Sequence, residues 1–258
     1  KNLKYGLLVS SELSWFGCSS SVNEDGRGCS FICDSVQYRV EFMSAGCVRI
    51  LSYPEGDTLV TKRLVVDAEK PTFKDYRYAE TKQTFVFRTH ELSVTFDKVN
   101  AAFIFHEAST GRLLLKEKDH KKARDFKRSE AGGEQCLEVI QRFIPTADEA
   151  IYGLGQYQNG IMNYRGKSVL LLQANMDIVN PFLISTNVYG VLWDNYSSTK
   201  FEDTKEGYSF TSEVGDASDY YFVYGKNMDE VVAGYRELTG DVPMFGKWVY
   251  GFWQSKER

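Results

Sequence analysis

Apolar and polar residues alternate along most of this chain. Residues 92–97 (LSVTFD) show the pattern plainly, because every second side chain is apolar. Between Gln37 and Tyr224, Gly, Pro, Asn or Asp interrupts such runs about every eight to twelve residues. This spacing predicts many short antiparallel strands with one buried face, packed as a large two-sheet β-sandwich. Further runs of this kind lie at 38–42, 48–51, 64–66, 85–87, 101–105 and 137–143.

Residues 116–130 (KEKDHKKARDFKRSE) interrupt the alternation with seven basic and four acidic side chains. A basic patch for nucleic acid would be expected to carry interleaved aromatic residues and one sign of charge. The mixed charge instead indicates a solvated excursion between strands.

A single segment has clear helical signals. Asn227 stands at a capping position with Glu230 three residues later, and Val231, Tyr235 and Leu238 follow with helical spacing. Gly240 and Pro243 then provide a stop. The sequence therefore predicts one helix that ends near 239.

An aromatic run, residues 247–254 (KWVYGFWQ), follows the predicted helix. Its pattern predicts a strand. Two interpretations stay open from the pattern alone: the first strand of another domain, or a final strand that docks onto the sandwich.

Composition excludes several classes of protein. The chain has 258 residues, of which 43% are hydrophobic and 26% charged, as in ordinary globular domains. A net charge of -4 disfavours nucleic acid as a partner. No run reaches the roughly 18 apolar residues of a membrane span, so no integral membrane segment is expected. The scattered histidines and cysteines predict no metal site and no cofactor.

The first 22 residues resemble a bacterial lipoprotein leader, with Lys1 and Lys4 before a partly apolar stretch and Cys18 after it. Glu12 and Trp15 depart from that pattern. Residues 1–22 are therefore an export leader or a disordered start. Localisation in the cell envelope or periplasm, as a lipoprotein, and localisation in the cytoplasm both stay open. The five cysteines imply no disulfide framework.

Five segments in series are informative together. They are IYGLGQ at 151–156, NPFLIS at 180–185, YGVLWDNY at 189–196, YYFVYG at 220–225 and PMFGKWVYGFWQSKER at 243–258. In this order and spacing they resemble the N-terminal part of glycoside hydrolase family 31, which contains retaining α-glucosidases and α-xylosidases. The QSKER ending is closer to the α-xylosidase members.

The resemblance implies an architecture and a division of the chain. It implies a galactose-mutarotase-like β-sandwich at 23–240, followed at 241–258 by a linker and the first strand of a (β/α)8 catalytic barrel. A barrel needs roughly 250 residues, so the remainder of the barrel is an expected partner outside this sequence.

Retaining glycoside cleavage needs two carboxyl groups about 5 to 5.5 Å apart. In the family these lie in a Trp-x-Asp-x-x-Glu-like segment and in an Asp followed by Gly-Gly. Neither segment occurs here, since Trp193-Asp194 has no downstream Glu and Gly132-Gly133 follows no such Asp. The sequence thus predicts no catalytic residue, and a chain that hydrolyses no glycoside by itself.

The resemblance does imply substrate-binding residues for an α-linked oligosaccharide. A family loop with an Asn-x-Asp pattern borders the leaving-group subsite, and Asn175 and Asp177 match that pattern. A polar turn capped by these residues is the simpler alternative. Gln254 and Lys256 would face the pocket from the end of the first barrel strand. Trp193 and Trp253 could stack on sugars, although tryptophan within apolar strands is more often core.

Two other functions remain as alternatives. A free-standing carbohydrate-binding module would expose aromatic side chains on a flat or grooved face. An aldose epimerase would place a histidine and a carboxylate on one face of a sugar pocket.

Overall fold

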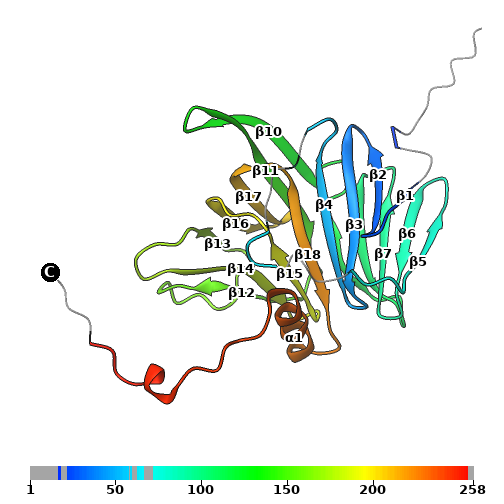
Figure 1. Ribbon diagram of the computed structural model, residues 1–258. Helices are drawn as coiled ribbons and strands as arrows, with labels where there is room; N and C mark the ends of the chain where they lie inside the picture. The colour runs from blue at the N-terminus through cyan, green and yellow to red at the C-terminus, as the bar shows by residue number, and fades with distance from the viewer. Residues whose placement is uncertain (1–16, 19–21, 58, 60–62, 67–71, 255–258) are drawn as a thin grey trace, which may run out of the picture.

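Two antiparallel β-sheets pack face to face in the computed structural model (Figure 1), which describes residues 17–18, 22–57, 59, 63–66 and 72–254. Their inner faces carry the apolar positions of the alternating pattern. The predicted all-β sandwich is confirmed.

The first sheet joins the beginning and the end of the sandwich sequence. Its eight strands follow the order β1-β2-β3-β4-β18-β15-β14-β12, so β4 pairs with the late strand β18. The strands are β1 (Asn23–Glu24), β2 (Cys29–Cys33), β3 (Val36–Ser44), β4 (Cys47–Pro54), β12 (Ile151–Gln156), β14 (Ile178–Ser185), β15 (Tyr189–Trp193) and β18 (Ser218–Tyr224).

The second sheet has ten strands. Nine follow the order β13-β16-β17-β11-β9-β8-β7-β6-β5, and β10 pairs with β11 beside this path. They are β5 (Arg77–Glu80), β6 (Thr84–Arg88), β7 (Leu92–Asp97), β8 (Ala102–Glu107), β9 (Leu113–Glu117), β10 (Arg124–Ala131), β11 (Glu134–Ile144), β13 (Ser168–Leu171), β16 (Thr199–Thr204) and β17 (Gly207–Gly215).

Aromatic rings fill the space between the sheets. Phe31 of β2 lies 4.7 Å from Phe96 of β7, measured between ring centroids. Phe105 of β8 stacks on Phe222 of β18 at 4.2 Å, which joins the two sheets near the middle. Aromatic pairs at these separations add stabilisation beyond the apolar area that they bury.

A buried ion pair lies among these rings and corrects one prediction. Arg124 of β10 donates to the carboxylate of Glu117, which is fully buried and also accepts from Gln141 and Tyr220, both at 2.9 Å. Buried charges are tolerated when they are paired and hydrogen-bonded in this way. The predicted excursion at 116–130 is therefore wrong over β10, a strand whose first residue belongs to the core.

Helix α1 (Met228–Thr239) covers the outer face of the first sheet. Asn227 caps it by accepting from the backbone N–H of Glu230 at 2.9 Å, and the helix ends at Gly240, as predicted. Val231 and Leu238 are buried against that sheet. None of the described helices is long and apolar enough to cross a membrane.

Two predicted strands are absent from the described residues. Leu64, Val65 and Val66 form bends instead of a strand. Residues 247–250 form a 3-10 turn, and the described residues after it pair with no strand. An aromatic run becomes a strand only where another strand pairs with it. The division at 241 and the barrel assignment of this segment stay predictions.

Most of the predicted leader lies outside the described residues, although Cys18 does not. Its sulfur forms a disulfide with Cys33 of β2. The sequence implied no such bond. A sulfur in a disulfide cannot carry a lipid thioether at the same time, so the two arrangements exclude one another at Cys18.

Candidate functional site

The loop between β13 and β14 crosses from the second sheet to the first and carries two of the predicted site residues. Its conformation is set by Gln173, whose side-chain amide donates to the Asp177 carbonyl at 2.6 Å and accepts from the Val179 N–H at 3.2 Å. Met176 has a positive φ of 68°, which closes the turn between Ala174 and Asp177. One glutamine thus holds both ends of the turn.

Asn175 and Asp177 lie on this loop, as predicted. Asn175 is exposed, and Asp177 is half-buried. Burial, with the neighbouring Tyr164 and then the charge of Asp177 as smaller causes, raises the pKa of Tyr157 to about 12. A carboxylate and an amide on one turn can together accept from and donate to sugar hydroxyls.

The other two predicted binding residues lie at the far end of the chain. Gln254 is exposed in the segment that follows the 3-10 turn, and Lys256 lies outside the described residues. Of the tryptophans, Trp193 is fully buried and stacks on Phe210 at 5.4 Å, whereas Trp253 is 63% exposed. The structure therefore groups Asn175 with Asp177 and leaves Gln254 on a separate segment.

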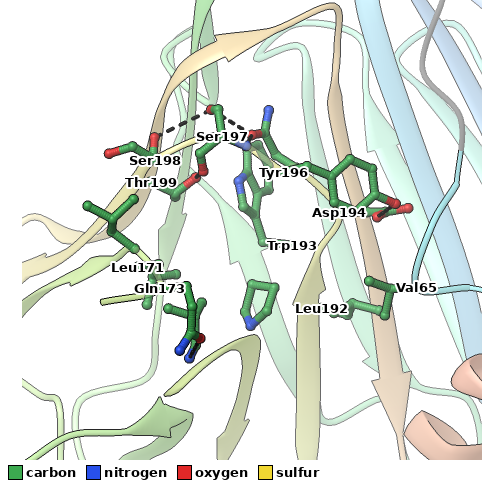
Figure 2. Close-up of a pocket in the computed structure, with 14 residues that line it drawn as sticks. Val65, Leu171, Gln173, Leu192, Trp193, Asp194, Tyr196, Ser197, Ser198 and Thr199 are labelled. Atoms are coloured by element: carbon green, nitrogen blue, oxygen red, sulfur yellow. Dashed lines mark hydrogen bonds between the residues drawn. The ribbon is translucent and has the colours of Figure 1, made fainter. Parts of the chain in front are cut away.

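A cavity of about 310 Å³ opens at the base of the loop (Figure 2). Leu171, Leu192 and the buried Trp193 give it apolar walls, and Figure 2 shows polar side chains of residues 197–199 along one side. Gln173 lines the cavity as well as holding the loop. The loop and the cavity therefore form one continuous region.

Asp194 is the buried acid of this region. It is 5% exposed, and its carboxylate accepts from the Tyr196 hydroxyl at 2.6 Å. That hydroxyl in turn accepts from the Leu64 N–H at 2.7 Å. Burial, reinforced by the nearby charge of Asp219, raises the pKa of Asp194 to about 6. Asp194 can therefore change its charge near neutral pH.

A second cavity, of about 590 Å³, adjoins the first and is lined by both Asp194 and Asp219. Asp219 is not free for chemistry, because its two carboxylate oxygens accept from Arg49 at 2.8 and 2.5 Å. Arg49 also donates to Glu41 at 2.9 Å. The two acids therefore do not provide the free nucleophile and proton donor that retaining cleavage needs.

Sequence reasoning missed the roles of Gln173, Asp194 and Tyr196. For Asp194 and Tyr196 the available signal was a polar cluster, DNYSS, that directly follows the apolar strand β15. Polar residues that directly follow a buried strand lie where the loops at that end of the sheet come together. Among the described residues, no group of three His, Cys, Asp or Glu side chains could hold a metal ion.

Comparisons with known proteins identify the family. Residues 37–202 match the model of the glycosyl hydrolase 31 N-terminal galactose mutarotase-like domain. An α-xylosidase of Saccharolobus solfataricus is 36% identical over 87% of this chain, which spans 31% of that protein. An α-glucosidase of Bacillus thermoamyloliquefaciens is 28% identical over 88% of the chain and 29% of its own length.

Solved structures share the fold. The α-xylosidase of Xanthomonas citri superposes with a TM-score of 0.78 at 22% identity, covering 92% of this chain and 42% of that one. The chain thus spans less than half of the relatives that it matches. With more than half of its residues matched by the family model, the chain belongs to glycoside hydrolase family 31, as an N-terminal galactose mutarotase-like domain.

Proposed function

We propose that this chain is the supporting N-terminal domain of a retaining α-glycosidase that acts on α-xylosides in preference to α-glucosides. The single observation that carries the substrate class is the 36% identity to an α-xylosidase across 87% of the chain. The match to the α-glucosidase over a similar length is weaker, at 28%. The reacting carboxylates would then belong to the catalytic barrel.

Within such an enzyme, the loop between β13 and β14 would contribute to the leaving-group side of the pocket. Asn175 and Asp177 would hydrogen-bond sugar hydroxyls there. The exposed apolar side chains of Met176 and Ile178, 65% and 57% exposed, would pack against the barrel. The loop and the C-terminal segment extend from the same side of the sandwich in Figure 1, which supports a barrel on that side.

The first test is the activity of the chain alone. Purified to homogeneity, it should release no p-nitrophenol from the α-xyloside or the α-glucoside. Turnover that stays with the protein through purification would contradict the proposal. Tight, saturable binding of an oligosaccharide by the inactive chain would instead favour a free-standing carbohydrate-binding module.

The second test joins this chain to the remainder of the Saccharolobus solfataricus α-xylosidase, in place of the matching N-terminal part. The chimera should hydrolyse the α-xyloside. Asp177→Asn should raise its KM by about tenfold, the loss expected for one charge-assisted hydrogen bond to a hydroxyl. Glu134→Gln, at the exposed first residue of β11, is the matched control. An unchanged KM in Asp177→Asn would remove the loop from the site.

A further inference from the structure

A third cavity lies at the opposite edge of the sandwich from β13. It has a volume of about 450 Å³ and is lined by Asp75, Arg77, Arg88, Thr89 and His90. In the second sheet β5 and β6 stand at the edge farthest from β13, so this cavity is remote from the loop that carries Asn175 (Figure 1). It has no place in the function proposed above.

Two arginines face one another across the strands that border the cavity. Arg77 of β5 and Arg88 of β6 are directly opposed partners in the antiparallel register. In the next pair of this register, Tyr78 is opposed to Phe87. Phe87 is fully buried, so the arginines occupy the outer face. Directly opposed like charges destabilise a sheet unless an ion of opposite charge lies between them.

No protein carboxylate fills that role among the residues that the structure describes. The ion pairs among the described residues include neither Arg77 nor Arg88, although Asp75 lines the same cavity. Arg88 donates to the Ala108 carbonyl at 2.6 Å, which orients its guanidinium and leaves other N–H groups for a ligand. The lining residues carry two guanidinium charges against one carboxylate.

The turn that presents His90 is also held firmly. The Thr89 hydroxyl donates to the Ala45 carbonyl at 2.6 Å and accepts from the Leu92 N–H at 2.9 Å. Thr89 is only 5% exposed, whereas His90 is exposed at the cavity. A third nitrogen-bearing side chain thus stands at a fixed place beside the two guanidinium groups.

We propose that this cavity, defined by Arg77, Arg88 and His90, binds a small oxyanion, a phosphate or a carboxylate group. Planar guanidinium groups recognise such oxygens in pairs, and two opposed arginines can grip one anion from both sides. A neutral sugar would not relieve the repulsion between the arginines. The site is therefore selective for charge.

The test is an NMR titration of the isotopically labelled chain with inorganic phosphate, with glucuronate and with neutral xylose. Phosphate or glucuronate should shift the His90 and Thr89 signals saturably, with a Kd on the order of 1 mM. The anion that binds with the lower Kd shows whether the cavity prefers a phosphate or a carboxylate group. Xylose should leave these signals unchanged.

Variants decide whether the arginines form the site. Arg77→Ala should weaken anion binding by about tenfold, and Arg88→Lys, which keeps the charge but loses the planar fork, by a smaller factor. Arg128→Ala, at a side chain that is 75% exposed on another strand, is the control and should bind as the unchanged chain does. Both Arg77 and Arg88 are exposed, so we expect both variants to fold.

Failure has a distinct signature. Linear shifts of equal size in the unchanged chain and in Arg77→Ala, or no shift with either anion, would overturn the proposal. Because the readout is direct binding at a remote edge, it is independent of any glycosidase activity.

Discussion

At the scale of single residues, the most informative group is the Asp194 carboxyl. It is buried beside Asp219, and its raised pKa of about 6 means that the folded chain holds this proton more tightly than the unfolded chain, whose Asp has a reference value of 3.8. Protonation therefore favours folding. The stabilisation is fully present below about pH 4 and is lost as the pH rises through about 6.

We expect Asp194→Asn to remove this dependence. At pH 7.5 the variant should be more stable than the unchanged chain, by up to about 3 kcal/mol for a shift of this size, and the difference should fall toward zero near pH 4. The measurement is the free energy of unfolding in urea across this pH range. Asp148→Asn, at an exposed acid, should follow the unchanged chain. A constant difference between Asp194→Asn and the unchanged chain at every pH would refute the assignment.

Sequence reasoning could place Asn175 and Asp177 on one loop, because they are two residues apart and the surrounding segments resemble a known family. It could not find the cavity behind that loop. Leu171 lies on β13 of the second sheet, Leu192 on β15 of the first sheet and Val65 outside the strands, so they meet only in the folded chain. Nor could it anticipate the buried acid, since the environment of Asp194 depends on Asp219, on another strand.

At the scale of elements, helix α1 shows how one cap supports a sheet surface. The Asn227 side chain accepts from the Glu230 N–H, and the Glu230 carboxylate accepts from the Lys226 N–H, both at 2.9 Å. The first bond satisfies a backbone donor that the first helical turn leaves free, and the second fixes the residue that precedes the cap. The helix they begin buries Val231 and Leu238 against the first sheet.

We expect Asn227→Ala to lower the free energy of unfolding by about 1 kcal/mol. The urea midpoint should fall while the slope of the transition stays the same, since the unfolded chain exposes the same surface. Lys226→Ala, which keeps the backbone N–H that Glu230 accepts from, is the matched control. Equal stability of Asn227→Ala and the control would show that the cap contributes nothing.

At this scale, the sequence predicts an element well when the residues that determine the element are neighbours in the chain. A helix signal is local, so Asn227, Glu230 and Gly240 were sufficient to predict both ends of α1. A strand depends on a neighbour, and the aromatic residues 247–254 remain without one among the described residues. Strand β10 was missed for the opposite reason, because pairing with β11 orders a segment whose charges suggested a solvated loop.

At the scale of the whole molecule, the sandwich and the segment after α1 differ sharply in burial. Beyond Gly240 the chain runs away from the two sheets (Figure 1), and its large apolar side chains are exposed. Met244 is 95% exposed, Trp248 73% and Phe252 87%. Apolar surface of this kind is covered by a partner in most proteins, and in the function proposed above that partner is the catalytic barrel.

The isolated chain should therefore self-associate. Each buried aromatic side chain is worth about 2 to 3 kcal/mol of transfer free energy, so two copies can gain by packing these segments together. Light scattering after size exclusion should show a mass that rises with protein concentration. Deleting residues 241–258, or replacing Trp248 and Phe252 with serine, should give a monomer with an unchanged melting temperature, because the sandwich core does not use these side chains. A monomer at every concentration in the unchanged chain would mean that the segment packs against its own sandwich. Deleting the segment should then lower the melting temperature.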